Sequence, residues 1–199
     1  MRTFVIRARK GPVLYGSIRN NIGVKGHFEI IAHSIINAFF VSNNFRSDVE
    51  VYIVLESSET FPYTIKLSSN DGLSLYGFHE EAIINLFEET LKKVVSLQKD
   101  ESIVTSPGVE VFGFGFEKCL NKFDSRHIYM LGPKGGDIRG TNIENNPVFL
   151  LSDNLPMPKN NIKSLVRKGV NTISLGKRML FASQIIVLLN YELDFQEFF

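Results

Sequence analysis

The sequence has little of what marks several common classes of protein. Cys119 is its single cysteine, which excludes an internal disulfide and a cysteine-cluster zinc site. The 199 residues include 15 glycines and 7 prolines and are 44% hydrophobic, so the composition is that of a folded chain. A chain of this length is expected to form one domain that buries roughly 70% of its unfolded surface.

Long apolar runs are also missing. The longest, residues 179–189, contains Ser183 and Gln184 and is far shorter than the ~20 residues that cross a bilayer. The first ten residues, MRTFVIRARK, alternate apolar and charged side chains, which is unlike a signal peptide. These features predict a cytoplasmic protein that has no contact with membranes.

Several motifs that carry chemistry are absent. The glycine-rich segment 132–137 matches neither GxGxxG nor Walker A, and Gly176-Lys177 is followed by Arg178 instead of Ser or Thr. No HExxH occurs and no two histidines are four residues apart, so no metal site is expected. GxSxG is missing as well, and the apolar neighbours of Cys119 are typical of a buried, inert thiol.

The net charge of +1, from 22 basic and 21 acidic residues, taken alone argues against a nucleic-acid partner. The distribution of charge along the chain leaves a nucleic-acid partner possible, because residues 1–28 and 154–191 each contain six basic residues and no acidic one. If folding brings these segments together, they could bind a phosphate backbone. The alternative is two separate, solvated faces.

Hydrophobic periodicity predicts strands that alternate with helices. The expected strands are 3–8, 49–55, 61–67, 127–131, 147–151 and 171–174, and the expected helices are 27–42, 79–98, 160–168 and 179–190. Residues 102–108 are the expected internal boundary. This order predicts an α/β fold with a largely parallel sheet flanked by helices.

Three of the expected strands end in small or polar residues, at 132–136, 152–154 and 175–178. Because parallel strands share one carboxyl edge, these loops predict a ligand pocket there. Two simpler interpretations stay open: the glycines could serve tight turns, and Ser152-Asp153 could be a turn or a helix cap.

Four segments resemble the TrmY family, the tRNA pseudouridine-54 N1-methyltransferases of the SPOUT class: 26–33 (GHFEIIAH), 45–49 (FRSDV), 149–153 (FLLSD) and 173–176 (ISLG). The resemblance covers essentially the whole chain. It implies a SPOUT-type sheet with a deep C-terminal trefoil knot, a homodimer, S-adenosylmethionine as cofactor and an RNA substrate, with tRNA as the expected RNA. It further implies one domain over 1–199, with a substrate-side half (1–101) and a knotted, cofactor-binding half (102–199).

The resemblance also implies site residues. Those expected to hold S-adenosylmethionine are Leu131, Gly132, Ser152, Asp153, Ser174, Leu175, Gly176, Met179, Leu180 and Ile185. Those expected to contact RNA are Arg9, Lys10, Arg19, His27, His33, Lys177 and Arg178.

Two further residues are catalytic candidates by the same resemblance. Glu29, where the family usually has Asp, would take the proton of the attacking nitrogen or hold the uracil edge. Arg46 would hold phosphate or base with its planar guanidinium. Glu29 could instead be an ordinary acidic residue near a helix N-terminus, where the helix dipole favours it.

Besides Glu29, the sequence departs from the family at four places. The family usually has Arg at His27 and His33, Gly at Ser152 and a Cys near Ile185. Loss of two arginines should weaken contact with tRNA phosphates. Two functions are therefore weighed, an active pseudouridine N1-methyltransferase and an RNA-binding paralogue with little or no activity. A third, methylation of a small-molecule or protein nitrogen, would predict binding that is insensitive to salt.

Overall fold

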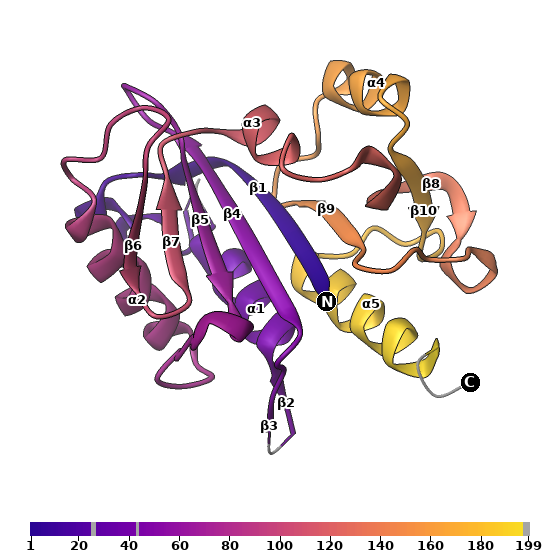
Figure 1. Cartoon of the computed structure of the whole chain (residues 1–199), viewed down its shortest axis with the longest axis horizontal. Helices are drawn as coiled ribbons and strands as arrows, with labels where there is room; N and C mark the ends of the chain where they lie inside the picture. Colours follow the sequence, from indigo (N-terminus) through magenta and orange to yellow (C-terminus); the bar gives the residue numbers. More distant parts are fainter. Residues whose placement is uncertain (25–26, 43, 197–199) are drawn as a thin grey trace.

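The computed structural model describes residues 1–24, 27–42 and 44–196, and within them eight strands form one sheet (Figure 1). Its strand order is β10-β8-β9-β1-β4-β5-β7-β6. The strands are β1 Arg2–Pro12, β4 Val49–Ser57, β5 Tyr63–Ser68, β6 Ser102–Ser106, β7 Val109–Phe112, β8 Ile128–Asp137, β9 Val148–Ser152 and β10 Asn171–Ser174. A separate small hairpin pairs β2 (Phe40–Val41) with β3 (Asn44–Phe45).

Five neighbouring strands of the large sheet, β10, β8, β9, β1 and β4, are mutually parallel. The other three, β5, β7 and β6, extend it in antiparallel fashion. The parallel strands are covered on both faces, so β4 is a continuous buried run from Val49 to Leu55. The predicted α/β fold with a largely parallel sheet is confirmed.

The segment expected to be an internal boundary is part of the sheet. Residues 102–106 form β6, and a turn at Pro107-Gly108 leads into β7, which pairs with β5. Gly108 has φ +70° and packs against Leu73, where a Cβ would lie 2.6 Å from the Leu73 backbone. The segment is a hairpin and not a linker, because Gly and Pro mark hairpin turns as well as linkers, and the division of the chain into two halves stays a prediction.

The helices cover the two faces of the sheet. One face carries α1 (Phe28–Phe39), α2 (Glu80–Lys93) and α5 (Ala182–Gln196), and the other carries α3 (Phe116–Leu120) and α4 (Lys159–Arg167). α1 and α5 pack side by side (Figure 1). The predicted helix 27–42 ends earlier, at Phe39, because the chain enters β2, whereas the last helix runs on to Gln196. Gly26, the first residue of the family-like segment, lies outside the described residues.

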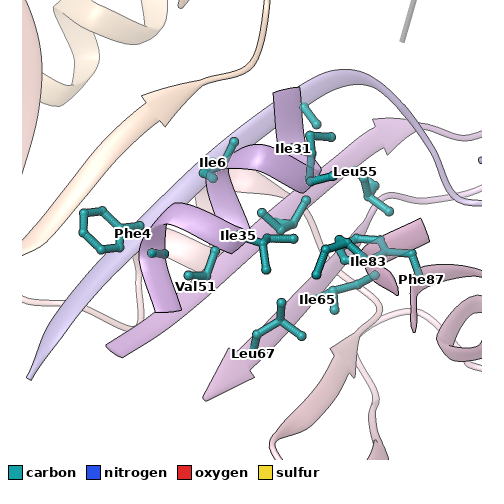
Figure 2. Close-up of a cluster of buried hydrophobic side chains, with 14 of the residues drawn as sticks. Phe4, Ile6, Ile31, Ile35, Val51, Leu55, Ile65, Leu67, Ile83 and Phe87 are labelled. Atoms are coloured by element: carbon teal, nitrogen blue, oxygen red, sulfur yellow. The ribbon is translucent and has the colours of Figure 1, made fainter. Parts of the chain in front are cut away.

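The larger core lies between the sheet and α1, α2 and α5. Figure 2 shows central side chains from β1, β4, β5, α1 and α2 pointing into one layer. The labelled residues are fully buried: Phe4, Ile6, Ile31, Ile35, Val51, Leu55, Ile65, Leu67, Ile83 and Phe87. This packing holds the parallel strands, and with them the loops at their carboxyl ends, in fixed positions.

A cluster of charged residues fixes the far end of α5. Asp194, on the last turns of α5, accepts hydrogen bonds from Arg2 Nη1 at 2.7 Å and from Arg46 Nη1 at 2.9 Å. Arg2 also donates to Asp48, at 3.1 Å. Burial raises the pKa of Asp194, but the two arginines outweigh this effect, and the pKa lies below its usual value. The first strand, the segment after β3 and the last helix are thereby joined through one carboxylate.

The variant Asp194→Asn tests the contribution of these ion pairs to stability. We expect it to lower the free energy of unfolding by about 2 kcal/mol at neutral pH, in the range of hydrogen bonds to charged groups. Because the folded-state pKa is lowered, this stabilisation is complete above about pH 4 and is lost as the pH falls through the folded value. Urea titrations from pH 7 to pH 3 should therefore show a flatter pH profile for the variant.

Asp124→Asn is a matched control, because Asp124 pairs with Arg126 on the exposed surface. Its effect on unfolding at neutral pH should be much smaller. Equal destabilisation by the two variants would contradict an anchoring role for Asp194.

Candidate functional site

A pocket lies where β10 ends and β8 bulges outward. It encloses about 240 Å³. Eight of the ten residues expected to bind the cofactor line it: Leu131, Gly132, Ser174, Leu175, Gly176, Met179, Leu180 and Ile185. Pro133, Lys177 and Arg178 complete the lining. Pro133 is absent from the predicted set, although it belongs to the glycine-rich segment that the sequence singles out.

One wall of the pocket is a bulge within β8. Met130 pairs with Thr172 of β10, but the next pair joins Gly136 to Ile173, so residues 131–135 leave the ladder and then return to it. A Cβ at Gly135 would lie 2.5 Å from the Ile173 carbonyl carbon, so this position requires glycine. The glycine-rich segment was expected to be a loop after the strand, and it is instead an interruption inside it.

The opposite wall is the turn from β10 into α5. The Gly176 amide donates to Ser174 Oγ at 3.1 Å, and Gly176 has φ +109°, a conformation that favours glycine. Leu180, just before α5, and Ile185, in its first turn, then supply apolar surface. Met179 is 98% exposed, so the pocket opens to solvent on its side.

Ser152 and Asp153 do not line this pocket, although they end a strand adjacent to β8. Asp153 is buried, and its Oδ1 accepts a hydrogen bond from the Leu155 amide at 3.0 Å. Its Oδ2 is buried without a partner in the described part of the chain. Burial raises the pKa of Asp153 to about 6. The turn that the sequence allowed at Ser152-Asp153 is thus present, and the second carboxylate oxygen is left without a hydrogen-bond partner among the described residues.

The two catalytic candidates lie outside the pocket of their own chain. Glu29 accepts hydrogen bonds from the Gly23 amide, at 3.0 Å, and pairs with His27 Nδ1, at 2.9 Å. Burial raises the pKa of Glu29, yet these hydrogen bonds outweigh it and the pKa lies below its usual value. Arg46 is held by Asp194, nine residues along α5 from Ile185, which corresponds to ~13 Å of helix.

The two basic segments differ in how much of their charge is neutralised. In the first, Arg7 pairs with Glu56, and Arg19 pairs with both Glu81 and Glu88. Of the histidines expected to contact RNA, His27 faces Glu29 and His33 faces Glu80 at 3.4 Å.

Arg9 and Lys10 lie apart from the pocket at 131–185. They are exposed and line a different hollow of about 850 Å³, at the carboxyl ends of β1 and β4. In the second basic segment, none of the six basic residues forms an ion pair with a described residue. The first segment therefore stabilises the fold with much of its charge, whereas the second leaves its charge open to solvent.

Other kinds of site find little support. Over residues 1–24, 27–42 and 44–196, no three His, Cys, Asp or Glu side chains lie together as a metal would need. No helix in these ranges is long and apolar enough to span a bilayer. Cys119 is buried, and burial raises the pKa of its thiol to about 12, which makes it a poor nucleophile.

The pocket's lining indicates the kind of ligand it suits. Leucine, isoleucine and proline side chains form its walls, and backbone from two tight turns forms its rim. Such a combination suits a flat, partly apolar group whose polar edges are held by backbone amides and carbonyls. Lys177 and Arg178 add positive charge beside the opening.

Comparisons with known proteins identify the family of the chain. Residues 1–198 match the family described as "Putative SAM-dependent RNA methyltransferase". Proteins from Vibrio campbellii (42% identical) and Alcanivorax borkumensis (40% identical), each aligned over 100% of both chains, are named "Putative pseudouridine methyltransferase".

A solved structure has a similar fold. Nep1 of Archaeoglobus fulgidus, bound to S-adenosylhomocysteine, superposes with a TM-score of 0.60 over 96% of both chains, at 12% identity. This similarity concerns the fold alone and confirms the predicted SPOUT-type α/β class, while the knot stays a prediction. Because the family match and the relatives span the whole chain, the chain belongs to the family of SAM-dependent RNA methyltransferases.

Proposed function

We propose that this protein transfers a methyl group from S-adenosylmethionine to N1 of pseudouridine in RNA, with tRNA as the substrate, in the cytoplasm. The observation that carries the proposal is that eight residues, expected from the sequence to bind the cofactor, line one pocket. The relatives named for pseudouridine methylation, about 40% identical over their whole length, support the choice of reaction.

The pocket residues fit the proposed cofactor. Leu131, Leu180 and Ile185 would pack on the adenine ring, and the turn at Ser174–Gly176 would bind its polar edge through backbone groups. The unpartnered Oδ2 of Asp153 is a buried acceptor one strand away, suited to a hydroxyl or amino group. The cofactor would supply a methyl group on a positively charged sulfur. A nitrogen that attacks the methyl carbon would displace this sulfur as a neutral thioether.

The chain itself must then orient the base and accept the proton of N1. Glu29, with its lowered pKa, is ionised at neutral pH and suits the role of a hydrogen-bond acceptor for the uracil edge. Arg46 remains our candidate for holding the substrate. Both lie outside the pocket of their own chain, so these roles need RNA or a second subunit to complete the site.

A homodimer is part of the proposal. α5 and the residue before it expose an apolar stripe at helical spacing, formed by Phe181, Leu188, Tyr191 and Phe195. The opposite side of the same helix is buried at Ile186 and Leu189 against the core. A helix that is apolar on both sides suits burial between its own core and a second copy.

One observation favours the second candidate function, an RNA-binding protein with little activity. The guanidinium of Arg46 is already bound by Asp194, which reduces what it can offer a substrate. Incubation with labelled S-adenosylmethionine and pseudouridine-containing tRNA separates the two. The methyltransferase yields labelled 1-methylpseudouridine by nucleoside mass spectrometry, whereas the RNA-binding protein yields a complex without label.

Leu180→Glu tests the pocket in the same assay. A carboxylate in an apolar wall should weaken the affinity for S-adenosylmethionine by at least tenfold, measured by calorimetry, and methyl transfer at low cofactor should fall in proportion. Gln184→Glu is the matched control, since it adds a carboxylate four residues further along the chain, in the first turn of α5, at a residue outside the pocket lining. Unchanged affinity in Leu180→Glu would rule out this pocket as the cofactor site.

Asp153→Asn tests the buried carboxylate. Because the folded pKa is raised to about 6, the ionised group destabilises the fold increasingly as the pH rises from about 4 to 6. The variant should therefore unfold at a higher temperature at pH 7.5 and lose this pH dependence. Its affinity for S-adenosylmethionine should decrease, and a variant that gains stability without losing affinity would argue against a role in binding.

Leu188→Glu tests the dimer. A charge in the centre of the apolar stripe should convert a dimer into a monomer in sedimentation-velocity experiments, because the buried carboxylate would have no partner. Val95→Glu, which adds the same charge at an exposed valine near the end of α2, should leave the mass unchanged. A wild-type protein that sediments as a monomer at all concentrations would contradict this assembly.

A further inference from the structure

α4 differs from the other long helices in its charge. Within α4, Lys159, Lys163 and Arg167 follow each other at four-residue intervals, so they lie along one side of the helix. All three are exposed, and none pairs with an acid among the described residues. The nearby carboxylate of Glu117 accepts instead from Asn161, at 3.0 Å.

This arrangement is unfavourable for the helix itself. A lysine in the first turn opposes the helix dipole, and like charges four residues apart repel each other. α2 shows the opposite pattern, with Glu80 and Glu81 in its first turn and Lys92 and Lys93 in its last. A same-sign row that weakens its own helix indicates a partner that supplies the missing negative charge.

The topology places the start of this row at the carboxyl edge of the sheet, where the candidate cofactor pocket also lies, on the face opposite α5. α4 connects β9 to β10, and both strands are parallel to β8, so the helix must run back from the carboxyl edge of the sheet. Lys159 therefore starts the row at the edge where the pocket lies, and Arg167 ends it ~12 Å away along the axis. On its inner side, α4 packs on the sheet through Ile162 and Leu165.

We propose that Lys159, Lys163 and Arg167 form a phosphate-binding row that holds the backbone of the RNA substrate while its target nucleotide reaches the pocket. This inference rests on the proposed function for the identity of the polyanion. Flexible, exposed cations at regular spacing suit a chain of phosphates and carry no information about base sequence. The row is thus expected to set the affinity for RNA. Other residues are expected to select the nucleotide.

The test replaces all three residues by glutamine, which keeps the aliphatic stems and the helix propensity. Binding of a fluorescently labelled tRNA transcript is measured by anisotropy from 50 to 300 mM salt. At 150 mM salt we expect a loss of about tenfold to a hundredfold, and a salt slope that is less steep by about 2 to 3. S-adenosylmethionine should bind with unchanged affinity, and the midpoint of thermal unfolding should stay the same or rise.

A triple glutamine variant at Lys92, Lys93 and Lys99 is the control, because it removes the same charge from the region of α2, on the other face of the sheet. The proposal is overturned if the control loses as much affinity as the α4 variant, or if the salt slope of the α4 variant matches wild type. The proposal is also overturned if the wild-type protein binds phosphatidylglycerol vesicles through these three residues more tightly than it binds tRNA.

Methyl transfer provides an independent readout. The α4 variant should show a raised KM for tRNA with little change in kcat, since the row binds RNA away from the reacting atoms. If the wild-type protein transfers no methyl group but loses RNA affinity on mutation of the row, the proposed reaction fails and the phosphate-binding row stands. If transfer is normal and the α4 variant has an unchanged KM, the row fails and the reaction stands.

Discussion

The position of α5 depends on the carboxylate of Asp194. It joins the first strand, through Arg2, and the segment after β3, through Arg46, to the last turns of the final helix. The first turn of the same helix forms a wall of the candidate cofactor pocket. Since a helix is a stiff rod, fixing one end and packing Ile186 and Leu189 against the core sets where Ile185 lies.

Much of the fold could be predicted because the signals were local. Buried strands such as 49–55 are recognisable by their apolar runs, and alternation of strands with helices specifies a parallel sheet. The hairpin at 102–112 was missed since its turn residues are those of a linker, and only the pairing of β7 with β5 distinguishes the two. The bulge in β8 was equally hidden, because Gly135 is required by its contact with Ile173, a residue 38 positions later.

The lining of the candidate pocket was easier to predict than the partners of the charged residues. The lining of the candidate cofactor pocket was predictable from strand ends, which the sequence marks with small residues, and from the family resemblance. The partners of single charged residues could not be predicted, since nothing local connects Arg46 to Asp194 or Arg19 to Glu81. For the same reason a net charge of +1 says little: it combines arginines that bind carboxylates with the unpaired basic residues of α4.

The bulge in β8 has a consequence for how the pocket recognises a ligand. Both ends of the segment 131–135 are hydrogen-bonded to the same neighbouring strand, so its shape is set when the sheet forms. The opposite wall, from Gly176 to Phe181, has no such pairing, and Met179 extends into solvent. Binding thus loses little conformational entropy on one side and more on the other. We expect the β8 bulge to determine which ligands the pocket selects. The wall from Gly176 to Phe181 is expected to determine how fast a ligand enters and leaves.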